Sequence, residues 1–274
     1  MSEAAMQKNI FQHELRIRWR SVLSWTLGLL GLHLLYLPFY GTFADQAALI
    51  NQMLANFPPE FLEAFGMSGV DLSTVLGFYS FIFAIAQLLL AIQAANYGVG
   101  LLSVEESEWT ADFLMTKPVS RQKIWVSKVL ATLTSLLVTD VALFVMVFGL
   151  IPLFDQGNSY DSALLTKLLL TVIPFQLFFF SLGLAISLLV RRVRNVTPYG
   201  LGLGFGTYVL NAFSGTLGES KLEWLTPFKH FDPAYLIQHN ALDNRLWPIS
   251  VLVIVSGLLF AYFRYLRRDI PAIS

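Results

Sequence analysis

The chain has 274 residues and no net charge at pH 7; 55% of its residues are hydrophobic and 13% are charged. Because a soluble domain carries about 25% charged residues, this composition excludes an ordinary soluble protein and indicates an integral membrane protein. The chain has no basic excess that would attract nucleic acid, and it has no cysteine for a disulfide framework or a thiolate metal site.

Six stretches are long and apolar enough to cross a bilayer core as helices, which takes about 20 residues. In chain order they cover residues 21–40, 74–103, 129–154, 168–190, 196–216 and 246–263. The second is longer than a bilayer requires, so we expect it to tilt or to project beyond the membrane. No linker or repeat divides the chain, and the sequence therefore predicts one all-α transmembrane domain over residues 1–274.

Residues 1–20, which precede the first span, predict a separate amphipathic helix at the membrane surface. Lys8, Arg16 and Arg20 lie at multiples of four residues and so share one side of a helix, beside an apolar stripe that includes Phe11 and Trp19. A basic amphipathic helix of this kind lies at the headgroup boundary of anionic lipid. A basic segment that only sets the orientation in the membrane remains an alternative.

Lysine and arginine fall mostly on one side of the predicted membrane. With the N-terminus inside, fourteen of the 18 basic residues flank the cytoplasmic ends of the spans. The other four lie outside: Lys167, Lys221, Lys229 and Arg245. Because cytoplasmic segments are enriched in Lys and Arg, we expect a multi-pass protein of a bacterial plasma membrane with both termini in the cytoplasm.

Two outer segments are rich in aromatic residues and proline. Residues 41–73 contain FPPEFLEAFGMSG, and residues 217–245 contain WLTPFKHFDPAYL. Since aromatic rings favour the headgroup level, we expect the first to lie at the membrane surface and the second to form a re-entrant or interfacial hairpin between spans five and six. An ordinary outer loop, and a metal site formed by His230, Asp232 and His239, remain alternatives.

The most distinctive polar segment joins the second span to the third and reads EESEWTADFLMTKPVSRQKIWVSK, from Glu105 to Lys128. Acidic residues crowd its start, where they complement the positive end of a helix dipole. The Lys117–Pro118 pair ends that helix because a residue before proline avoids helical backbone angles, and Ser120 suits the N-cap of the next helix. The pattern predicts a short amphipathic helix on the cytoplasmic surface, joined to a span at each end; a simple solvated connector is the alternative.

This segment resembles the first cytoplasmic loop of the type-2 ABC-transporter permease family. Ten residues occupy positions of the family's motif: Thr110, Asp112, Phe113, Leu114, Pro118, Val119, Ser120, Arg121, Ile124 and Lys128. Trp109 and Ala111 stand where the family usually has Gly and Leu. The start HELRIRWRSVLSW, the six predicted spans and the ending YFRYLRRDI are also similar to the family, so the resemblance covers the whole chain.

The resemblance implies the membrane subunit of an ATP-driven transporter, most often an exporter, that pairs with a second permease copy or a paralogue. The segment from Glu105 to Arg121 would be a coupling helix docked on a cytoplasmic ATPase, beside the N-terminal helix. The residues assigned to this contact are Glu105, Glu106, Glu108, Trp109, Asp112, Phe113, Leu114, Pro118 and Arg121. ATP and Mg²⁺ are expected on the ATPase, and no cofactor on this chain, because the sequence contains no G-x-x-x-x-G-K-[ST] phosphate loop.

Polar residues inside the spans leave two interpretations open. Asp140 lies near the middle of the third span, where an ionisable group is costly and faces protein or water. It serves either the substrate path or the packing of helices. Gln87, Gln93 and Asn96 in the second span either line a polar path or bond to neighbouring helices.

The fifth span contains PYGLGLGFG, in which Gly200 with Gly204 and Gly202 with Gly206 form two small-xxx-small pairs. Such pairs allow the backbones of two helices to approach closely. The partner helix belongs either to the same chain or, as the resemblance implies, to the region near a dimer interface and the translocation path.

A different class of function also remains: a non-transporting membrane scaffold, or a membrane-embedded enzyme whose loop recruits a soluble partner. An enzyme would need clustered His, Glu or Asp within the membrane, and Asp140 is the only acidic residue in the predicted spans. The sequence has no H-E-x-x-H motif and no nucleophile elbow. We therefore expect no catalytic site in this chain.

Overall fold

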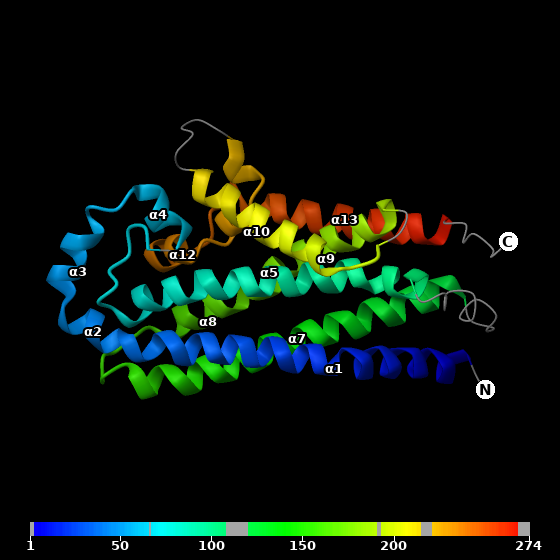
Figure 1. Cartoon of the computed structure of the whole chain (residues 1–274), viewed down its shortest axis with the longest axis horizontal. Helices are drawn as coiled ribbons and strands as arrows, with labels where there is room; N and C mark the ends of the chain where they lie inside the picture. The colour runs from blue at the N-terminus through cyan, green and yellow to red at the C-terminus, as the bar shows by residue number, and fades with distance from the viewer. Residues whose placement is uncertain (1–2, 66, 108–119, 191–192, 215–220, 268–274) are drawn as a thin grey trace.

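The computed structural model describes residues 3–65, 67–107, 120–190, 193–214 and 221–267, and all regular structure in these residues is helical (Figure 1). The helices of 18 residues or more are α1 (Glu3–Tyr36), α5 (Val75–Ser107), α7 (Arg121–Phe154), α9 (Val172–Leu189), α10 (Thr197–Ser214) and α13 (Trp247–Arg267). The shorter helices are η1 (Leu37–Phe39), α2 (Tyr40–Asp45), α3 (Ala47–Leu54), α4 (Pro59–Ala64), α8 (Ser162–Leu170), η2 (Lys221–Trp224), α11 (Pro227–His230) and α12 (Pro233–His239).

Five helical stretches in the described residues are long and apolar enough to cross a membrane. They are Gln7–Asp45, Val75–Leu102, Arg121–Phe154, Ser162–Leu189 and Trp247–Arg267. The all-α membrane class predicted from the sequence is thereby confirmed. The helix predicted as the fifth span, α10, is not among the five, because its glycine, tyrosine and asparagine residues lower its mean hydropathy.

The first helix differs from the prediction. The surface helix expected over residues 1–20 is not a separate element, since α1 runs without a break from Glu3 to Tyr36. No proline interrupts it before Pro38, so nothing in the sequence forces the chain to turn at Ser21. A helix of 34 residues is about 50 Å long and exceeds the bilayer core of about 30 Å.

The fourth predicted span consists of two helices. The helix α8 begins at Ser162, earlier than expected, and Thr171 separates it from α9. Proline at position 174 explains the break, because its ring nitrogen cannot donate a hydrogen bond to the carbonyl oxygen four residues earlier.

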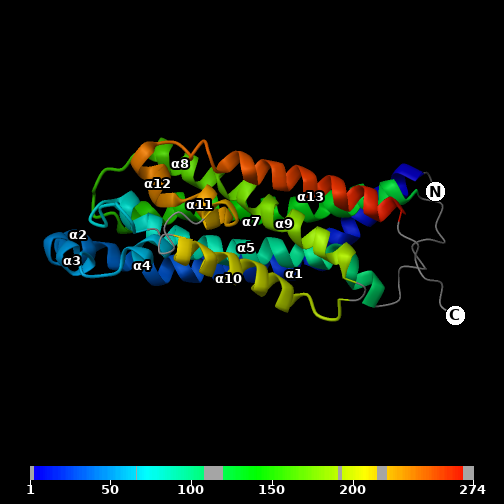
Figure 2. The ribbon, with the colours of Figure 1, turned by 90° about the horizontal axis from the view of Figure 1, so that it is seen from above.

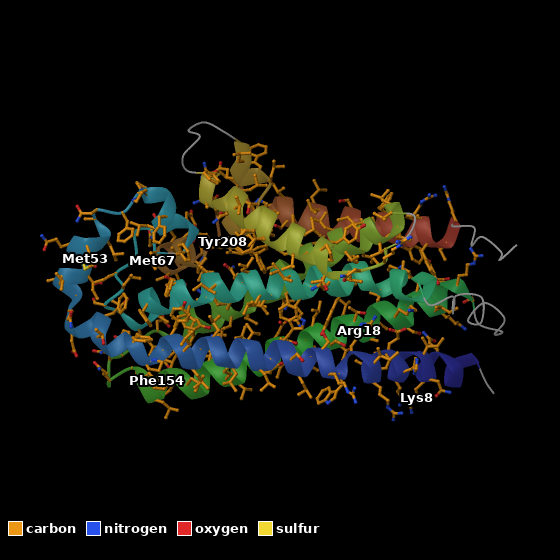
Figure 3. The ribbon with its side chains drawn as sticks, in the orientation of Figure 1. Lys8, Arg18, Met53, Met67, Phe154 and Tyr208 are labelled. Carbon is orange, nitrogen blue, oxygen red and sulfur yellow. The ribbon has the colours of Figure 1, made fainter. Side chains whose placement is uncertain are left out.

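The ends of the long helices define two ends of the bundle (Figures 1 and 2). The first turn of α1, the last turn of α5, the first turn of α7 and the last turn of α13 lie together at what we call the N-terminal end. The short helices α2, α3, α4 and α12 lie at the opposite end (Figure 1). Lys8 and Arg18 lie toward the N-terminal end, whereas Met53, Met67 and Phe154 lie at the opposite end (Figure 3).

Close packing of α5 against α9 depends on two glycines, Gly98 and Gly183, each of which contacts the backbone of the other's helix. A Cβ atom added to Gly98 of α5 would lie 2.3 Å from the carbonyl oxygen of Phe180, and one added to Gly183 of α9 would lie 2.5 Å from that of Ala95. Only glycine permits so short an approach. Consistent with this geometry, α5 packs most extensively against α9.

The segment between α10 and α13 packs into the bundle. Phe228 and Phe231 are buried, and both rings contact Phe175 of α9, with centroids 5.1 and 6.1 Å apart. The Nε2 of Gln87 donates to the carbonyl oxygen of Phe231 at 2.9 Å. Gln87 lies more than three turns from the start of α5. The junction of α11 and α12 therefore extends from the opposite end of the bundle into its interior.

The other aromatic segment forms α2, α3 and α4. Leu49, Met53, Phe57 and Phe61 are exposed there. Phe65 contacts the ring of Tyr208 at 6.3 Å and thus connects this segment to α10.

Candidate functional site at the N-terminal end

A fully buried lysine joins three helices at the N-terminal end of the bundle. Lys128, two turns into α7, is 2% exposed. Its Nζ lies 2.9 Å from the Oε1 of Glu14 on α1 and donates to the carbonyl oxygen of Leu101 on α5 at 3.2 Å. Glu14 also pairs with Arg18 of its own helix, at a spacing of four residues. We call these residues the Lys128 junction.

The Lys128 junction satisfies groups that would otherwise be costly to bury. An isolated charge transferred out of water loses its solvation, and here the ammonium group faces a carboxylate and a main-chain carbonyl. The carboxylate in turn has two cationic partners, Lys128 and Arg18. The ion pair specifies how α1 and α7 meet, because a buried ion pair tolerates little displacement before one charge is left without a partner; the bond to Leu101 joins α5 to this pair.

The Lys128 junction lies next to the polar segment singled out in the sequence. Leu101 is in the last two turns of α5, and Lys128 is eight residues beyond Ser120. Ser120 is the N-cap of α7, as predicted, and its side chain accepts a hydrogen bond from the amide of Lys123 at 3.4 Å. The helices on both sides of residues 108–119 are therefore tied to each other and to α1.

The predicted ATPase-contact residues divide into two groups. Glu105 and Glu106 belong to the last turn of α5, which extends beyond the predicted end at residue 103, and Arg121 is the first residue of α7. The others lie outside the described residues: Glu108, Trp109, Asp112, Phe113, Leu114 and Pro118.

The basic residues predicted for a surface helix lie on the exposed side of α1. Lys8, Arg16 and Arg20 are all exposed, and Lys8 points away from the bundle (Figure 3). Glu14, which the sequence analysis did not select, lies on the buried side of the same helix. A signal was present, since Glu14 is the one acidic residue between Lys8 and Arg20 and stands four residues before Arg18.

Deeper in the bundle, a chain of hydrogen bonds connects three helices. The Nε2 of Gln93 on α5 donates to the Oγ1 of Thr139 on α7 at 2.9 Å, and the Nε2 of Gln176 on α9 lies 3.5 Å from the Oε1 of Gln93. Asp140 follows Thr139 and is half-buried, and its Oδ1 has no hydrogen-bond partner.

The four glycines of α10 fall into two pairs with different surroundings. A Cβ added to Gly200 would lie 2.2 Å from the Oδ1 of Asn96, and one added to Gly204 would lie 2.7 Å from the Cγ1 of Ile92, so this pair packs against α5. Gly202 and Gly206 have no atom within 4 Å of the added Cβ.

The histidine of α11 has hydrogen-bond partners for both ring nitrogens. The Nε2 of His230 donates to the carbonyl oxygen of Glu223 at 3.1 Å, and the Nδ1 lies 2.6 Å from the hydroxyl of Ser250. Burial lowers the pKa of His230, and the bonds to main-chain carbonyls oppose this shift only in part. Asp232, the third residue considered for a metal, caps α12 instead. Among the described residues, no group of three or more His, Cys, Asp or Glu is arranged to hold a metal ion.

These features define an all-helical integral membrane protein whose buried polar contacts connect helices. A family model described as "ABC-2 family transporter protein" matches residues 8–270. The chain therefore belongs to the ABC-2 transporter family, whose members are membrane subunits and not the catalytic ATPase of the transporter. No curated protein and no solved structure matches the chain.

Proposed function

We propose that this chain is the permease subunit of an ATP-driven exporter, powered by a separate cytoplasmic ATPase and paired with a second permease copy or paralogue. The observation that carries the proposal is the Lys128 junction in a chain of this family. It joins α1 to the two helices that flank residues 108–119. A force applied to that segment would therefore reach three long helices at once.

In this proposal the N-terminal end of the bundle is cytoplasmic. Exposed basic residues at this end include Lys8, Arg16, Arg20, Arg264 and Arg267. The opposite end has fewer basic residues, and residues 41–73 carry no Lys or Arg at all. An excess of Lys and Arg on the cytoplasmic side supports this orientation.

We further propose that α10 also crosses the membrane, as the fifth of six spans in chain order, although it is less apolar than the others. It packs along α5 through Gly200 and Gly204. Its exposed side chains include Leu201, Phe205, Val209 and Phe213, which suit contact with lipid or with another permease. The α11–α12 segment would then be a re-entrant hairpin that enters from the outer side, in keeping with the bond between Gln87 and Phe231.

The mechanism would be alternating access. ATP brings the paired ATPases together, residues 105–121 move with the ATPase as a coupling helix, and α5 and α7 change their tilt. Glu105 and Glu106 lie in the last turn of α5 and Arg121 begins α7, so these residues border the segment on both sides. The energy must come from another polypeptide, because this chain has no phosphate loop.

Co-purification tests the proposal. We expect the tagged full-length chain, extracted in mild detergent, to retain a polypeptide that contains a phosphate-loop motif and hydrolyses ATP. The double charge reversal Asp112→Lys with Arg121→Glu should release this ATPase. The matched control, Arg245→Glu, changes a residue with a 79% exposed side chain at the opposite end and should retain it. If the unaltered chain retains no ATPase, the proposed function is wrong.

Orientation has a test of its own. A membrane-impermeant maleimide added to intact cells should label Arg245→Cys and should label Arg121→Cys only after permeabilisation. Each cysteine is the only thiol in the chain. Labelling of Arg121→Cys in intact cells would place the segment outside the cell and contradict the proposal.

A further inference from the structure

The long helices fall into two packed groups. In the first, which we call the α1/α7 body, α7 packs mainly along α1. In the second, which we call the α5/α9 body, α5 packs against α9 and α10, and α9 packs against α13. Residues 108–119 connect α5 of one body to α7 of the other.

Glycines bring the helices of the α5/α9 body close together. The pair Gly98 and Gly183 brings α5 against α9. Gly257 of α13 would place a Cβ 3.1 Å from that of Ser181 on α9, and Gly200 and Gly204 bring α10 against α5. The contact between α5 and α9 leaves little room for one helix to shift past the other, because the atoms nearest to Gly98 and Gly183 belong to the main chain and cannot move aside as a side chain does.

Side chains, rather than glycines, join the two bodies. Among the described residues, hydrogen bonds between four pairs of residues cross the interface between the α1/α7 body and α5, and we call this interface the polar seam. They join His33 to Tyr79 (3.3 Å), Thr139 to Gln93 (2.9 Å), Ser21 to Tyr97 (3.1 Å), and Lys128 to the carbonyl oxygen of Leu101 (3.2 Å). For none of the glycines that the structure describes in the long helices is an atom of the other body among the three atoms nearest to its added Cβ.

This contrast has a mechanical consequence. Hydrogen bonds between membrane helices are individually weak, since the polar groups find other partners when the helices shift. Ser, Thr, Gln and Lys side chains change rotamer and partner within the space that they already occupy. The polar seam is therefore the interface at which the bundle rearranges most readily.

We propose that the α1/α7 body moves as one unit against the α5/α9 body along the polar seam, and that this movement within a single chain accompanies the transport step. The proposal rests on the proposed function for its driving force. Residues 105–121 connect the two bodies at the N-terminal end, so a displacement there acts directly across the seam.

Lys128 is the positioning residue of this movement. Its bond to Glu14 lies within the α1/α7 body and holds α7 to α1, whereas its bond to the carbonyl oxygen of Leu101 crosses the polar seam. The ion pair is the stronger of the two, because both groups are charged. When the bodies separate, the bond to Leu101 breaks first and Lys128 stays with Glu14.

Distances between pairs of spin labels, measured by double electron–electron resonance, test the proposal. The chain has no cysteine, so only introduced thiols are labelled. Four exposed positions at the N-terminal end are suitable: Gln12 on α1, Gln122 on α7, Leu189 on α9 and Arg264 on α13. The pair Gln12–Gln122 lies within one body, Leu189–Arg264 lies within the other, and Gln122–Leu189 spans the polar seam.

The sample is the full chain with its co-purified ATPase in lipid nanodiscs, without nucleotide and trapped with ADP and vanadate. We expect trapping to change the Gln122–Leu189 distance by about 2 Å or more, as helix shifts in switching proteins do, and to leave the two within-body distances unchanged. The proposal is overturned if all three distances stay the same, or if the Gln12–Gln122 distance changes as much as the one across the seam.

A variant separates a positioning role of Lys128 from a purely structural one. The double variant Glu14→Gln with Lys128→Met removes both charges of the ion pair. It also removes the hydrogen bond from Lys128 to Leu101 across the polar seam. We expect the Gln122–Leu189 distribution to broaden while both within-body distributions stay narrow. Broadening of all three distributions would show that Lys128 only supports the fold and would refute its assigned role.

The same labels distinguish failure of this inference from failure of the proposed function. If no ATPase co-purifies, the proposed function fails, and the chain alone in nanodiscs decides the inference. The inference then predicts a broader distance distribution for Gln122–Leu189 than for either within-body pair. Equal widths would overturn it. If the ATPase is present and the seam does not move, the inference fails and the proposed function stands.

Discussion

Removing one partner of the Lys128 junction should destabilise the protein more than removing both. Lys128→Met removes one of the two cationic partners of Glu14, and Glu14→Gln removes the Glu14 carboxylate from beside a lysine that is 2% exposed. Loss of one partner of a buried ion pair costs about 3–5 kcal/mol, whereas replacement of the whole pair by apolar or neutral groups is often close to neutral. We expect the larger loss for Glu14→Gln, because Lys128 is the more deeply buried partner.

The expected values follow from these contacts. Glu14→Gln should cost about 3 kcal/mol or more, Lys128→Met somewhat less because Arg18 remains, and the double variant about 1 kcal/mol. Thermal unfolding in detergent, calibrated by reversible unfolding in a denaturing surfactant, supplies the three values. Lys8→Met, at an exposed position of α1, is the matched control and should change stability by less than about 0.5 kcal/mol.

Two outcomes would refute this reasoning. The first is that both single variants cost no more than the exposed control, which would mean that the ion pair is solvated. The second is that the double variant costs the sum of the single variants, which would mean that the two side chains do not interact.

Three further predictions concern other parts of the bundle. Gly98→Ala should abolish folding or cost several kcal/mol, since the added Cβ would lie 2.3 Å from a carbonyl oxygen of α9, whereas Gly202→Ala, with open space around it, should leave thermal stability nearly unchanged. Ser120→Ala removes the N-cap of α7 and should cost about 1 kcal/mol, visible as a lower melting temperature that Ser120→Asp restores. Because burial lowers the pKa of His230 below the unfolded value of about 6.5, its contribution to stability is present above pH 6.5 and is lost as the pH falls toward 5. His230→Gln should flatten this part of the stability–pH curve and His239→Gln, at an exposed site, should not; equal curves would contradict the assignment.

Local features of the structure followed from the sequence. The positions of the long apolar helices and the N-cap at Ser120 depend on composition and on residues close together in the chain. The same applies to the gathering of basic residues at one end of the bundle. These features required no knowledge of which helices touch.

Features that depend on contacts between distant segments were not predicted. Glu14 and Lys128 are more than a hundred residues apart. The sequence around each residue does not show that the two side chains meet. The sequence does not show which helix a glycine faces: Gly98 and Gly183 each approach the other's helix, whereas Gly202 and Gly206 of the glycine-rich α10 have no atom of the described residues within 4 Å of an added Cβ.

The continuity of α1 was also missed, for a related reason. The polar character of residues 1–20 indicated a surface helix, but the buried partner of Glu14 on α7 allows this polar stretch to continue the span as one helix. Local amphipathicity shows that a helix has two faces, and it does not show whether lipid or another helix covers the apolar face.

The central claim is that residues 105–121 contact an ATPase that drives this membrane subunit. A photo-activated cross-linker on Arg121→Cys, in membranes that contain the native partners, tests the contact directly, with Arg245→Cys as the control at the opposite end. We expect position 121 alone to form an adduct with a polypeptide that hydrolyses ATP. An adduct with no ATPase, or the same adduct from position 245, would contradict the account.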